Sequence, residues 1–476
     1  MSMENTRIWA ALCTLRGREH RQLERFVSSP FFNRNEALVR LLAYLLRCLA
    51  DKRPPEKPAA REAAFPGNQA DDGALRLACS DLLGLVERFW VYQARQNDPA
   101  LTQLALAEAL HSRGLNKPAR AALRQAMQFR ESTSERDATL FDFRFRAGML
   151  QYQDATATRR YDAFNLQETS DALDAAYLIR KLRHVCLALS HQTVFAAEYQ
   201  FGPLPAFFQW IESDNLTRHP VLALYYHACR FLLEPAGEGH FATFRQVLAA
   251  RPETLPEDER RTLYLLALNF GIKRGNERGA PWHRETFELY RNALGQGLLL
   301  EHGRISRFAF NNMIGLAIRL QEIEWAEAFL SEYAAVLENN QRPVTLALTR
   351  AQLAFARRDY DAALAALQSA DYRDFLNNLV ARILQLKIYF ETDAWELLEH
   401  HLQNMERYVR RHRVAGYHRD NARMLIHFTR LLMRTPVFET GKREALRREI
   451  AETPVLTERE WLLSVVGRWR SVVGGR

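Results

Sequence analysis

The 476 residues are 47% hydrophobic and 25% charged, which excludes a disordered or fibrous chain, and no apolar run is long enough to span a membrane. This length exceeds the range in which a single hydrophobic core keeps growing, so we expect two or three domains or one long solenoid. The net charge of +9 lies mostly in residues 406–476, which hold 16 Lys and Arg against 8 Asp and Glu.

Residues 1–50 predict a hairpin of two helices. The apolar stripe of the first helix stops before Pro30, which biases the preceding residue away from helical geometry, so we expect this helix to end near Ser28. The second helix should begin at Asn33, with Glu36 three residues later as the reciprocal partner of a capping box.

The turn of this hairpin contains two adjacent aromatic residues, Phe31 and Phe32. They could bind a ligand, or they could form a wedge that packs the two helices together. Aromatic side chains usually serve hydrophobic cores, so we favour the wedge. We expect both rings to pack on the apolar stripe of the second helix.

Residues 51–73 form a Pro-rich connection with four prolines and two glycines. This composition interrupts regular structure, and a short helix is expected only near residues 59–64. Residues 74–99 then predict a strong helix with a wide apolar face. We therefore expect the first hundred residues to form a small helical cap.

Residues 100–405 predict an irregular α-solenoid of helical hairpins, with the clearest repeats in residues 309–405. A comparison of the chain with itself at a shift of 35 residues aligns an aromatic column and, three positions later, a column of small or apolar residues. These columns are Trp325, Tyr360 and Trp395, and Ala328, Ala363 and Leu398. With 11% aromatic residues, only about 0.05 such aromatic columns are expected by chance.

An aromatic residue that opens the second helix of a hairpin, followed by alanine three positions later, resembles the tetratricopeptide repeat (TPR). The sequence departs from that repeat at Gly315, Arg350 and Gln385, which stand where the repeat usually has leucine. The resemblance therefore implies TPR-like helical hairpins and not a consensus array.

Four further blocks are "LERFVSSPFFNRN", "LRLACSDLLGLVERFWVYQ", "WAEAFLSEYAAVL" and "MERYVRRHRVAGYHRDNARMLIHF". In this order they resemble blocks of a family of large helical-repeat proteins of Bacteroidota, and they span nearly the whole chain. The resemblance implies a TPR-like cytoplasmic protein. It carries over no functional residue, because we know of no activity assigned to that family.

Motifs that carry chemistry are missing from the sequence. There is no phosphate-binding loop, dinucleotide fingerprint, HExxH or GxSxG pattern. The cysteines are odd in number and widely spaced, which favours buried free thiols in a reducing compartment; they are Cys13, Cys48, Cys79, Cys186 and Cys229. We therefore expect a cytoplasmic protein that is not an enzyme, with no catalytic residue, cofactor or metal site.

Residues 406–476 predict a basic helical C-terminal cap whose arginines are candidate contacts for phosphate or for a partner. They are Arg407, Arg410, Arg411, Arg413, Arg419, Arg423 and Arg430. Helical spacing places the last three on one stripe. Such a patch could bind nucleic acid, or it could be a solvated surface that contacts an acidic protein, and we favour the second interpretation.

The leading functional hypothesis is a non-enzymatic scaffold that binds a protein or peptide, because helical repeats most often present a groove to polypeptide segments. The alternative is a nucleic-acid-associated regulatory protein that uses the arginine-rich face. The sequence indicates no membrane partner and no small-molecule substrate.

Overall fold

The protein is all-helical, as the sequence predicts. A computed structural model describes residues 2–67, 70–133, 137–158, 164–194, 197–234, 238–250, 254–338, 342–372, 374–411, 416–435, 439–454 and 456–468. Within these ranges the strands are β1 (Leu300–Glu301) and β2 (Arg304–Ile305), which form one short antiparallel pair. No helix in the described part of the chain combines the length and apolarity that crossing a membrane requires.

The chain divides into two compact units, and helix α8 (Ala138–Thr158) contributes to both. The first unit comprises Met1–Thr133 and Met149–Phe164, and the second comprises Ser134–Gly148 and Asn165–Arg476. The predicted start of the solenoid, between residues 99 and 100, does not coincide with this division, because the two helices that follow it belong to the first unit.

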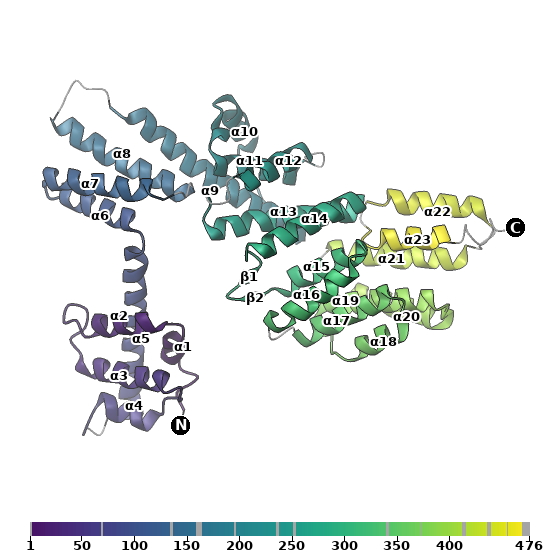
Figure 1. Cartoon of the computed structure of the whole chain (residues 1–476), viewed down its shortest axis with the longest axis horizontal. Helices are drawn as coiled ribbons and strands as arrows, with labels where there is room; N and C mark the ends of the chain where they lie inside the picture. The colour runs from purple at the N-terminus through teal and green to yellow at the C-terminus, as the bar shows by residue number, and fades with distance from the viewer. Residues whose placement is uncertain are drawn as a thin grey trace. The chain divides into compact units, whose positions relative to one another are not determined.

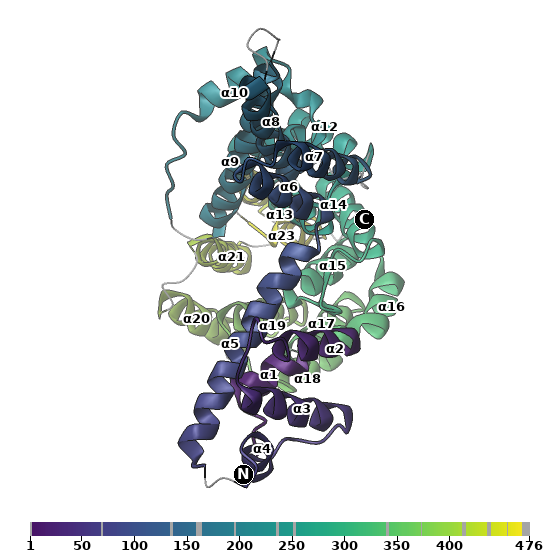
Figure 2. The ribbon, with the colours of Figure 1, turned by 90° about the vertical axis from the view of Figure 1, so that its left-hand side faces the viewer.

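The first unit contains α1 (Arg7–Cys13), α2 (Gly17–Val27), α3 (Glu36–Ala50), α4 (Lys57–Ala64), α5 (Asp72–Gln96), α6 (Pro99–His111) and α7 (Asn116–Glu131) (Figure 1). The long helix α5 packs against each of α1 to α4 (Figure 2). Their core is mostly aliphatic, with Leu12, Leu23, Leu41 and Leu82 fully buried, and it also contains Phe26 and Phe89. The apolar face predicted for residues 74–99 is therefore the face that joins this bundle.

The second unit contains the remaining helices (Figure 1). They are α9 (Leu166–Val194), α10 (Leu204–Ser213), α11 (Pro220–Leu233), α12 (Glu238–Ala250), α13 (Glu257–Arg278), α14 (Ala280–Gly295), α15 (Arg307–Arg319), α16 (Ile323–Tyr333), α17 (Arg342–Ala356), α18 (Tyr360–Gln368), α19 (Phe375–Glu391), α20 (Trp395–Arg411), α21 (Gly416–Arg434), α22 (Thr440–Glu452) and α23 (Arg459–Arg468). Neighbours in sequence pack together, and α15, α17 and α19 also lie side by side.

The hairpin of α2 and α3 differs from the prediction at its second helix. Helix α3 begins at Glu36, and its N-cap is Asn35, whose Oδ1 accepts a hydrogen bond from the backbone N–H of Ala37 at 3.0 Å. Asn33, the predicted start, instead donates its Nδ2 hydrogen to the carbonyl of Val27 at 2.9 Å. This bond ties the turn to the end of α2, and the N-cap of the second helix lies two residues later than expected.

The aromatic pair in this turn is divided between core and solvent. The ring of Phe32 stacks on Phe26 with centroids 4.1 Å apart, so the wedge interpretation holds for Phe32. It is wrong for Phe31, whose side chain is 88% exposed. Consecutive side chains in the turn diverge, and only one of the two rings reaches the core.

Several hairpins close with the same turn, a Schellman motif. One residue in the left-handed region follows the helix at Gly114, Gln321, Arg358 and Asp393, with φ between 54° and 75°. In each case the next N–H donates to the carbonyl five residues back at 2.8–3.0 Å. These bonds satisfy carbonyls that the helix end leaves unpaired. The motif therefore fixes where each second helix begins.

These turns correct the predicted repeat register. Helices α16, α18 and α20 begin at Ile323, Tyr360 and Trp395, so Ile323 and not Trp325 occupies the helix-start position. The spacing between these starts is 37 residues and then 35. Accordingly Ala326 is fully buried like Ala363, whereas the predicted equivalent Ala328 is exposed.

Trp325 contributes to packing elsewhere. Its ring contacts Phe287 edge-on at 4.8 Å and stacks near Phe329 at 5.1 Å. Tyr360 and Trp395 instead contact Phe355 and Phe390, the aromatic residues at the ends of the preceding helices. The three aromatic residues aligned in the sequence are therefore not structurally equivalent. Tyr360 and Trp395 begin the second helix of a hairpin, whereas Trp325 lies two residues inside its helix.

Helices α13 and α14 approach each other closely at two glycines. A Cβ atom added to Gly271 or Gly275 would lie within 3.0 Å of the side chains of Thr286 and His283, respectively. Both of those residues are buried, at 1% and 4% exposure. The close crossing therefore requires glycine at these two positions.

We expect Gly271→Ala to lower the free energy of unfolding by about 1–3 kcal/mol, because overpacking forces the two helices apart. Gly315→Ala is the matched control, since its added Cβ meets no atom within 4 Å. That control should leave stability unchanged or raise it by about 0.5–1 kcal/mol through helix propensity. Urea denaturation of the two variants measures the difference, and equal midpoints would contradict the close crossing.

Candidate functional site

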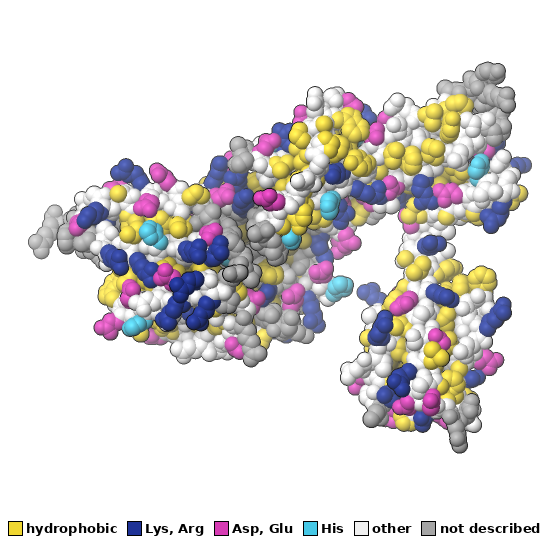
Figure 3. Space-filling model, turned by 180° about the vertical axis from the view of Figure 1, so that it is seen from behind, with side chains coloured by type: hydrophobic (Ala, Val, Ile, Leu, Met, Phe, Trp, Pro, Cys, Tyr) yellow, Lys and Arg dark blue, Asp and Glu magenta, His cyan; other side chains and the backbone are white. Residues whose placement is uncertain are grey.

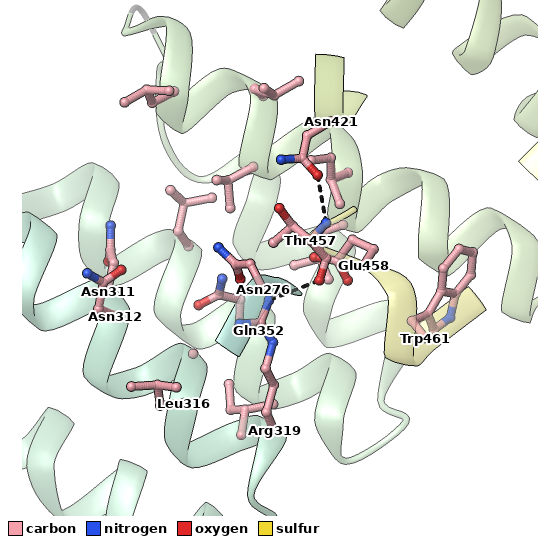
Figure 4. Close-up of a pocket in the computed structure, with 18 of the residues that line it drawn as sticks. Asn276, Asn311, Asn312, Leu316, Arg319, Gln352, Asn421, Thr457, Glu458 and Trp461 are labelled. Carbon is pink, nitrogen blue, oxygen red and sulfur yellow. Dashed lines mark hydrogen bonds between the residues drawn. The ribbon is translucent and has the colours of Figure 1, made fainter. Parts of the chain in front are cut away.

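A cavity of about 470 Å³ lies inside the second unit (Figure 4). Its lining comes from α13, α15, α17, α19 and α21, and from residues 457–461 at the start of α23. The volume falls within the range of pockets that enclose small molecules or short peptide segments. We call this feature the amide cavity, after the carboxamide side chains described below.

The side-by-side helices α15, α17 and α19 contribute equivalent positions to the amide cavity. Gly315, Gln352 and Lys387 line it, and their spacings of 37 and 35 residues match those of the hairpin turns. Gly315 leaves open space, because a Cβ atom there would meet no atom within 4 Å. The cavity is thus partly a consequence of glycine at one position of the repeat.

Apolar side chains form part of the lining and remain accessible. Phe308 is 56% exposed and Val380 is 37% exposed, and both face the same space as Leu316 and Trp461. Exposed apolar side chains beside convergent polar groups are typical of binding sites.

Three carboxamides of the lining have unmade hydrogen bonds. Asn377 and Asn421 are 5% and 8% exposed, and the Nδ2 of each has no partner in the described structure. Asn311 likewise has an unpaired, buried Oδ1. Each such group costs about 1–3 kcal/mol when it is buried without a partner. A ligand that accepts hydrogen bonds from the amide NH2 groups of Asn377 and Asn421 and donates one to the amide oxygen of Asn311 would recover this free energy.

The charged side chains of the amide cavity are compensated. Lys387 Nζ lies 2.9 Å from Glu458 Oε2, Arg307 lies 3.4 Å from Asp374, and His283 lies 3.3 Å from Glu460. Their charges therefore face opposite charges or a histidine inside the protein.

The ionisation of Glu458 agrees with this compensation. Burial alone would raise the pKa of its carboxyl group, but Lys387 and Arg319 outweigh burial and hold the pKa below the ordinary value. Glu458 therefore stays charged and paired at neutral pH. The groups of the cavity that lack partners are neutral amides.

The backbone of Thr457, which precedes α23, is hydrogen-bonded to side chains that line the amide cavity. The backbone N–H of Thr457 donates to Asn421 Oδ1 at 2.6 Å, and Arg319 Nη2 donates to the Thr457 carbonyl at 3.5 Å (Figure 4). The indole N–H of Trp461 donates to Glu391 at 2.9 Å. Side chains of the inner helices thus hold a non-helical backbone segment in place.

The arginines predicted from sequence lie elsewhere in the second unit. Arg407, Arg410 and Arg411 are on α20, and Arg419, Arg423 and Arg430 share α21 as expected. Arg413 lies outside the described residues. None of them is part of the amide cavity lining.

Nearby carboxylates compensate part of this arginine set. Arg430 contacts Glu406 at 2.8 Å, and Arg419 and Arg423 lie 3.5 and 3.9 Å from Asp420. Figure 3 shows basic side chains gathered over part of the second unit, with a few acidic ones among them. Arg410 and Arg411 are exposed and form no ion pair with any described carboxylate. The predicted stripe is therefore mostly internally neutralised.

The residues of the amide cavity were not selected from the sequence. Asn311, Asn377 and Asn421 are separated by 66 and 44 residues and belong to three different helices. The only signal in the sequence is an amide on an otherwise apolar helical face, which is common in helical proteins. Their convergence depends on tertiary packing.

The cysteines are not all buried as expected. Cys13 is exposed and Cys79 is half-buried. Cys186 and Cys229 are fully buried on α9 and α11, where their Sγ atoms lie 3.3 Å apart. Burial raises the pKa of the Cys186 thiol well above its ordinary value, so this thiol stays protonated at neutral pH.

Within the described ranges, no three His, Cys, Asp or Glu side chains are grouped as metal ligands would be. No protein-family model matches the chain, and comparisons with curated proteins and with solved structures likewise find no significant match.

Proposed function

We propose that the protein is a non-enzymatic scaffold whose amide cavity binds an uncharged, partly apolar segment of a partner polypeptide. The observation that carries this proposal is the convergence of Asn311, Asn377 and Asn421, with unmade hydrogen bonds, on a cavity whose charges are compensated. A peptide backbone supplies both N–H donors and carbonyl acceptors, and its side chains suit the apolar wall.

The binding of the chain's own Thr457 backbone supports this choice of ligand. Asn421 and Arg319 already bond the N–H and the carbonyl of that residue. Asn377 and Asn311 offer the same chemistry to a second segment. A charged ligand such as a phosphate fits less well, because the cationic side chains of the lining have acidic or carbonyl partners.

At the level of architecture, we propose that the part of residues 100–405 that belongs to the second unit forms an irregular α-solenoid of TPR-like hairpins in a cytoplasmic protein. The repeated Schellman turns and the side-by-side packing of α15, α17 and α19 support this arrangement. The family resemblance to Bacteroidota helical-repeat proteins agrees with it. In such an arrangement the first helices of successive hairpins form the ligand-binding surface.

We expect Gly315→Leu to abolish this binding by filling the amide cavity. The probe is a random peptide library displayed on phage and selected on the full-length protein. For the uncharged peptides selected in this way, Gly315→Leu should lower the affinity at least tenfold, since a tenfold loss corresponds to about 1.4 kcal/mol. Asn377→Leu should have a similar effect by removing a donor.

The matched control is Gly84→Leu, because Gly84 is also helical and its added Cβ also meets no atom within 4 Å, but it lies on α5 in the first unit. Its peptide affinities should equal those of the unchanged protein. If Gly315→Leu and Gly84→Leu bind the selected peptides equally well, the amide cavity is not the site.

The alternative, a nucleic-acid partner at the arginine-rich face, rests on the exposed residues Arg407, Arg410 and Arg411, which form no ion pair with any described carboxylate. Three such arginines neutralise about three phosphates, whereas proteins that bind nucleic acid mainly through charge commonly contact six to ten. The carboxylates Glu406 and Asp420 reduce the attraction further. We therefore favour a polypeptide partner over a nucleic-acid partner.

A further inference from the structure

The first unit carries a second hollow, between α2 and α5, with a volume of about 580 Å³. Phe26, Phe32, Phe89 and Tyr92 contribute to its lining, so we call it the aromatic groove. It shares no residue with the amide cavity and belongs to the other compact unit.

The rings of the aromatic groove form a continuous array that extends from the core to the surface. Phe26 lies 4.1 Å from Phe32, 5.6 Å from Phe89 and 6.0 Å from Tyr92 between ring centroids. Phe26 and Phe89 are buried, whereas Tyr92 is 48% exposed. The exposed ring of Phe31 continues the array edge-on from Phe32 at 5.0 Å.

This arrangement holds accessible aromatic surface rigidly in place. Phe32 is stacked on the buried Phe26, and Tyr92 contacts Phe26 at a tilt. A partner that covers these two rings therefore orders few additional side chains. Pre-ordered aromatic side chains of this kind dominate the free energy of many protein interfaces.

The rim of the aromatic groove is basic. Arg18 and Arg25 line it from α2, are exposed, and form no ion pair with any described carboxylate. The one acidic side chain in the lining, Glu19, accepts a hydrogen bond from the backbone N–H of Arg16 at 2.8 Å and so caps its own helix. Two cations therefore face the groove without compensation.

We propose that the aromatic groove binds an acidic segment of a partner protein, which packs an aromatic or large aliphatic side chain against Phe32 and Tyr92 and places carboxylates opposite Arg18 and Arg25. Arginine suits this role because its planar guanidinium can bond both oxygens of a carboxylate. The charge of the rim supplies selectivity and the rings supply most of the affinity.

A single-stranded nucleic acid fits the aromatic groove less well. Bases stack on open ring faces in such complexes, but here Phe26 and Phe32 cover each other. The rim also offers two cations and not an extended basic track.

The test uses the full-length protein and a phage-displayed random peptide library. Peptides are selected on the unchanged protein after removal of those that also bind the charge-reversed variant Arg18→Glu/Arg25→Glu. We expect the recovered peptides to carry Asp or Glu on either side of a Trp, Phe or Leu. Synthetic versions should bind the charge-reversed variant at least tenfold more weakly.

Two further measurements distinguish a direct charge contact from loss of structure. Peptides in which Asp and Glu are replaced by Lys should recover affinity for the charge-reversed variant. Arg21→Glu is the matched control, because Arg21 is exposed on the same helix but does not line the groove. It should leave peptide affinity unchanged.

The proposal is overturned if no peptide is recovered, if the recovered peptides lack acidic residues, or if the charge-swapped peptides fail to regain affinity. It is also overturned if a fluorescent single-stranded RNA binds the unchanged protein and loses its affinity in the charge-reversed variant. Gly315→Leu should not affect binding at the aromatic groove, so failure here is distinct from failure of the amide cavity.

Discussion

Replacing Glu259 with alanine should lower the free energy of unfolding by about 3 kcal/mol. Glu259 is 6% exposed on α13, and its carboxylate accepts hydrogen bonds from the hydroxyl of Tyr225 at 2.6 Å and from Arg183 at 2.7 Å. Tyr225 is fully buried. The substitution therefore leaves a hydroxyl without a partner at the junction of three helices, α9, α11 and α13.

The size of the expected loss in the free energy of unfolding depends mainly on Tyr225. Arg183 keeps 42% of its side chain exposed and can regain water as a partner, so its loss adds little. Burial and the negative charge of Glu259 raise the pKa of Tyr225, and the phenol therefore remains a hydrogen-bond donor at neutral pH.

Tyr225→Phe separates the hydroxyl from the rest of the network. If the hydroxyl causes most of the loss, the double variant Tyr225→Phe/Glu259→Ala should be less destabilised than the sum of the single variants. Glu257→Ala is the control, since its exposed carboxylate lies 3.9 Å from Arg261 and should change stability by less than about 0.5 kcal/mol. Urea denaturation measures all four, and strict additivity would argue against the network.

The helices that could be predicted from sequence are those defined by local pattern. The segment 74–99 corresponds to α5, Asp72–Gln96, and the short helix expected at 59–64 corresponds to α4, Lys57–Ala64. In both cases apolar periodicity, proline and glycine specify the element within the segment itself.

The repeat register could not be obtained in the same way. It is fixed by left-handed residues after the first helix of each hairpin, and in the clearest repeats these are Gln321, Arg358 and Asp393. None is glycine, so the turn leaves no signature in the sequence. An alignment of aromatic residues then placed Trp325 two positions away from the true helix start.

The amide cavity escaped prediction for a different reason. Its free volume depends on Gly315, and its polar groups come from helices distant in sequence. A single asparagine on an apolar face has many structural explanations. Only after packing does it become clear that the Nδ2 atoms of Asn377 and Asn421 have no partner among the described residues. Sequence pattern could therefore identify the helices but not the site between them.

The attachment of α23 should be sensitive to acid, because three carboxylates hold it. Glu391 accepts hydrogen bonds from both terminal nitrogens of Arg468, at 2.7 and 2.5 Å, and one from Trp461. Glu458 pairs with Lys387, and Glu460 contacts His283. Segment 456–468 is thus fixed to the helices around it through ionised groups.

The direction of the pH effect follows from the pKa of each carboxyl group. For Glu391, burial raises the pKa, but the hydrogen bonds from Arg468 and Trp461 outweigh it. The hydrogen bond from His283 lowers the pKa of Glu460. All three values lie below the ordinary 4.5. Their contribution is therefore complete above pH 4.5 and is lost as the pH falls through the lowered values.

At neutral pH, Glu391→Gln should reproduce much of this loss. It removes the charge that Arg468 bonds with two nitrogens, and each hydrogen bond to a charged group contributes about 1.5–3 kcal/mol. A local loss of about 2–3 kcal/mol would speed amide hydrogen exchange in residues 459–468 by roughly 30- to 150-fold. Hydrogen exchange with mass spectrometry measures this rate, with Glu449→Gln, an exposed carboxylate on α22, as the control.

Glu391→Gln should also change the affinity of the amide cavity for peptides, because Thr457 and Trp461 form part of its lining. When α23 is released, Asn421 loses the backbone of Thr457 and gains a free acceptor, so affinity for a selected peptide should change together with the exchange rate. If exchange in residues 459–468 accelerates while peptide affinity stays constant, the segment is only a structural strap. If neither changes, the ion pairs of Glu391 do not hold α23 in place.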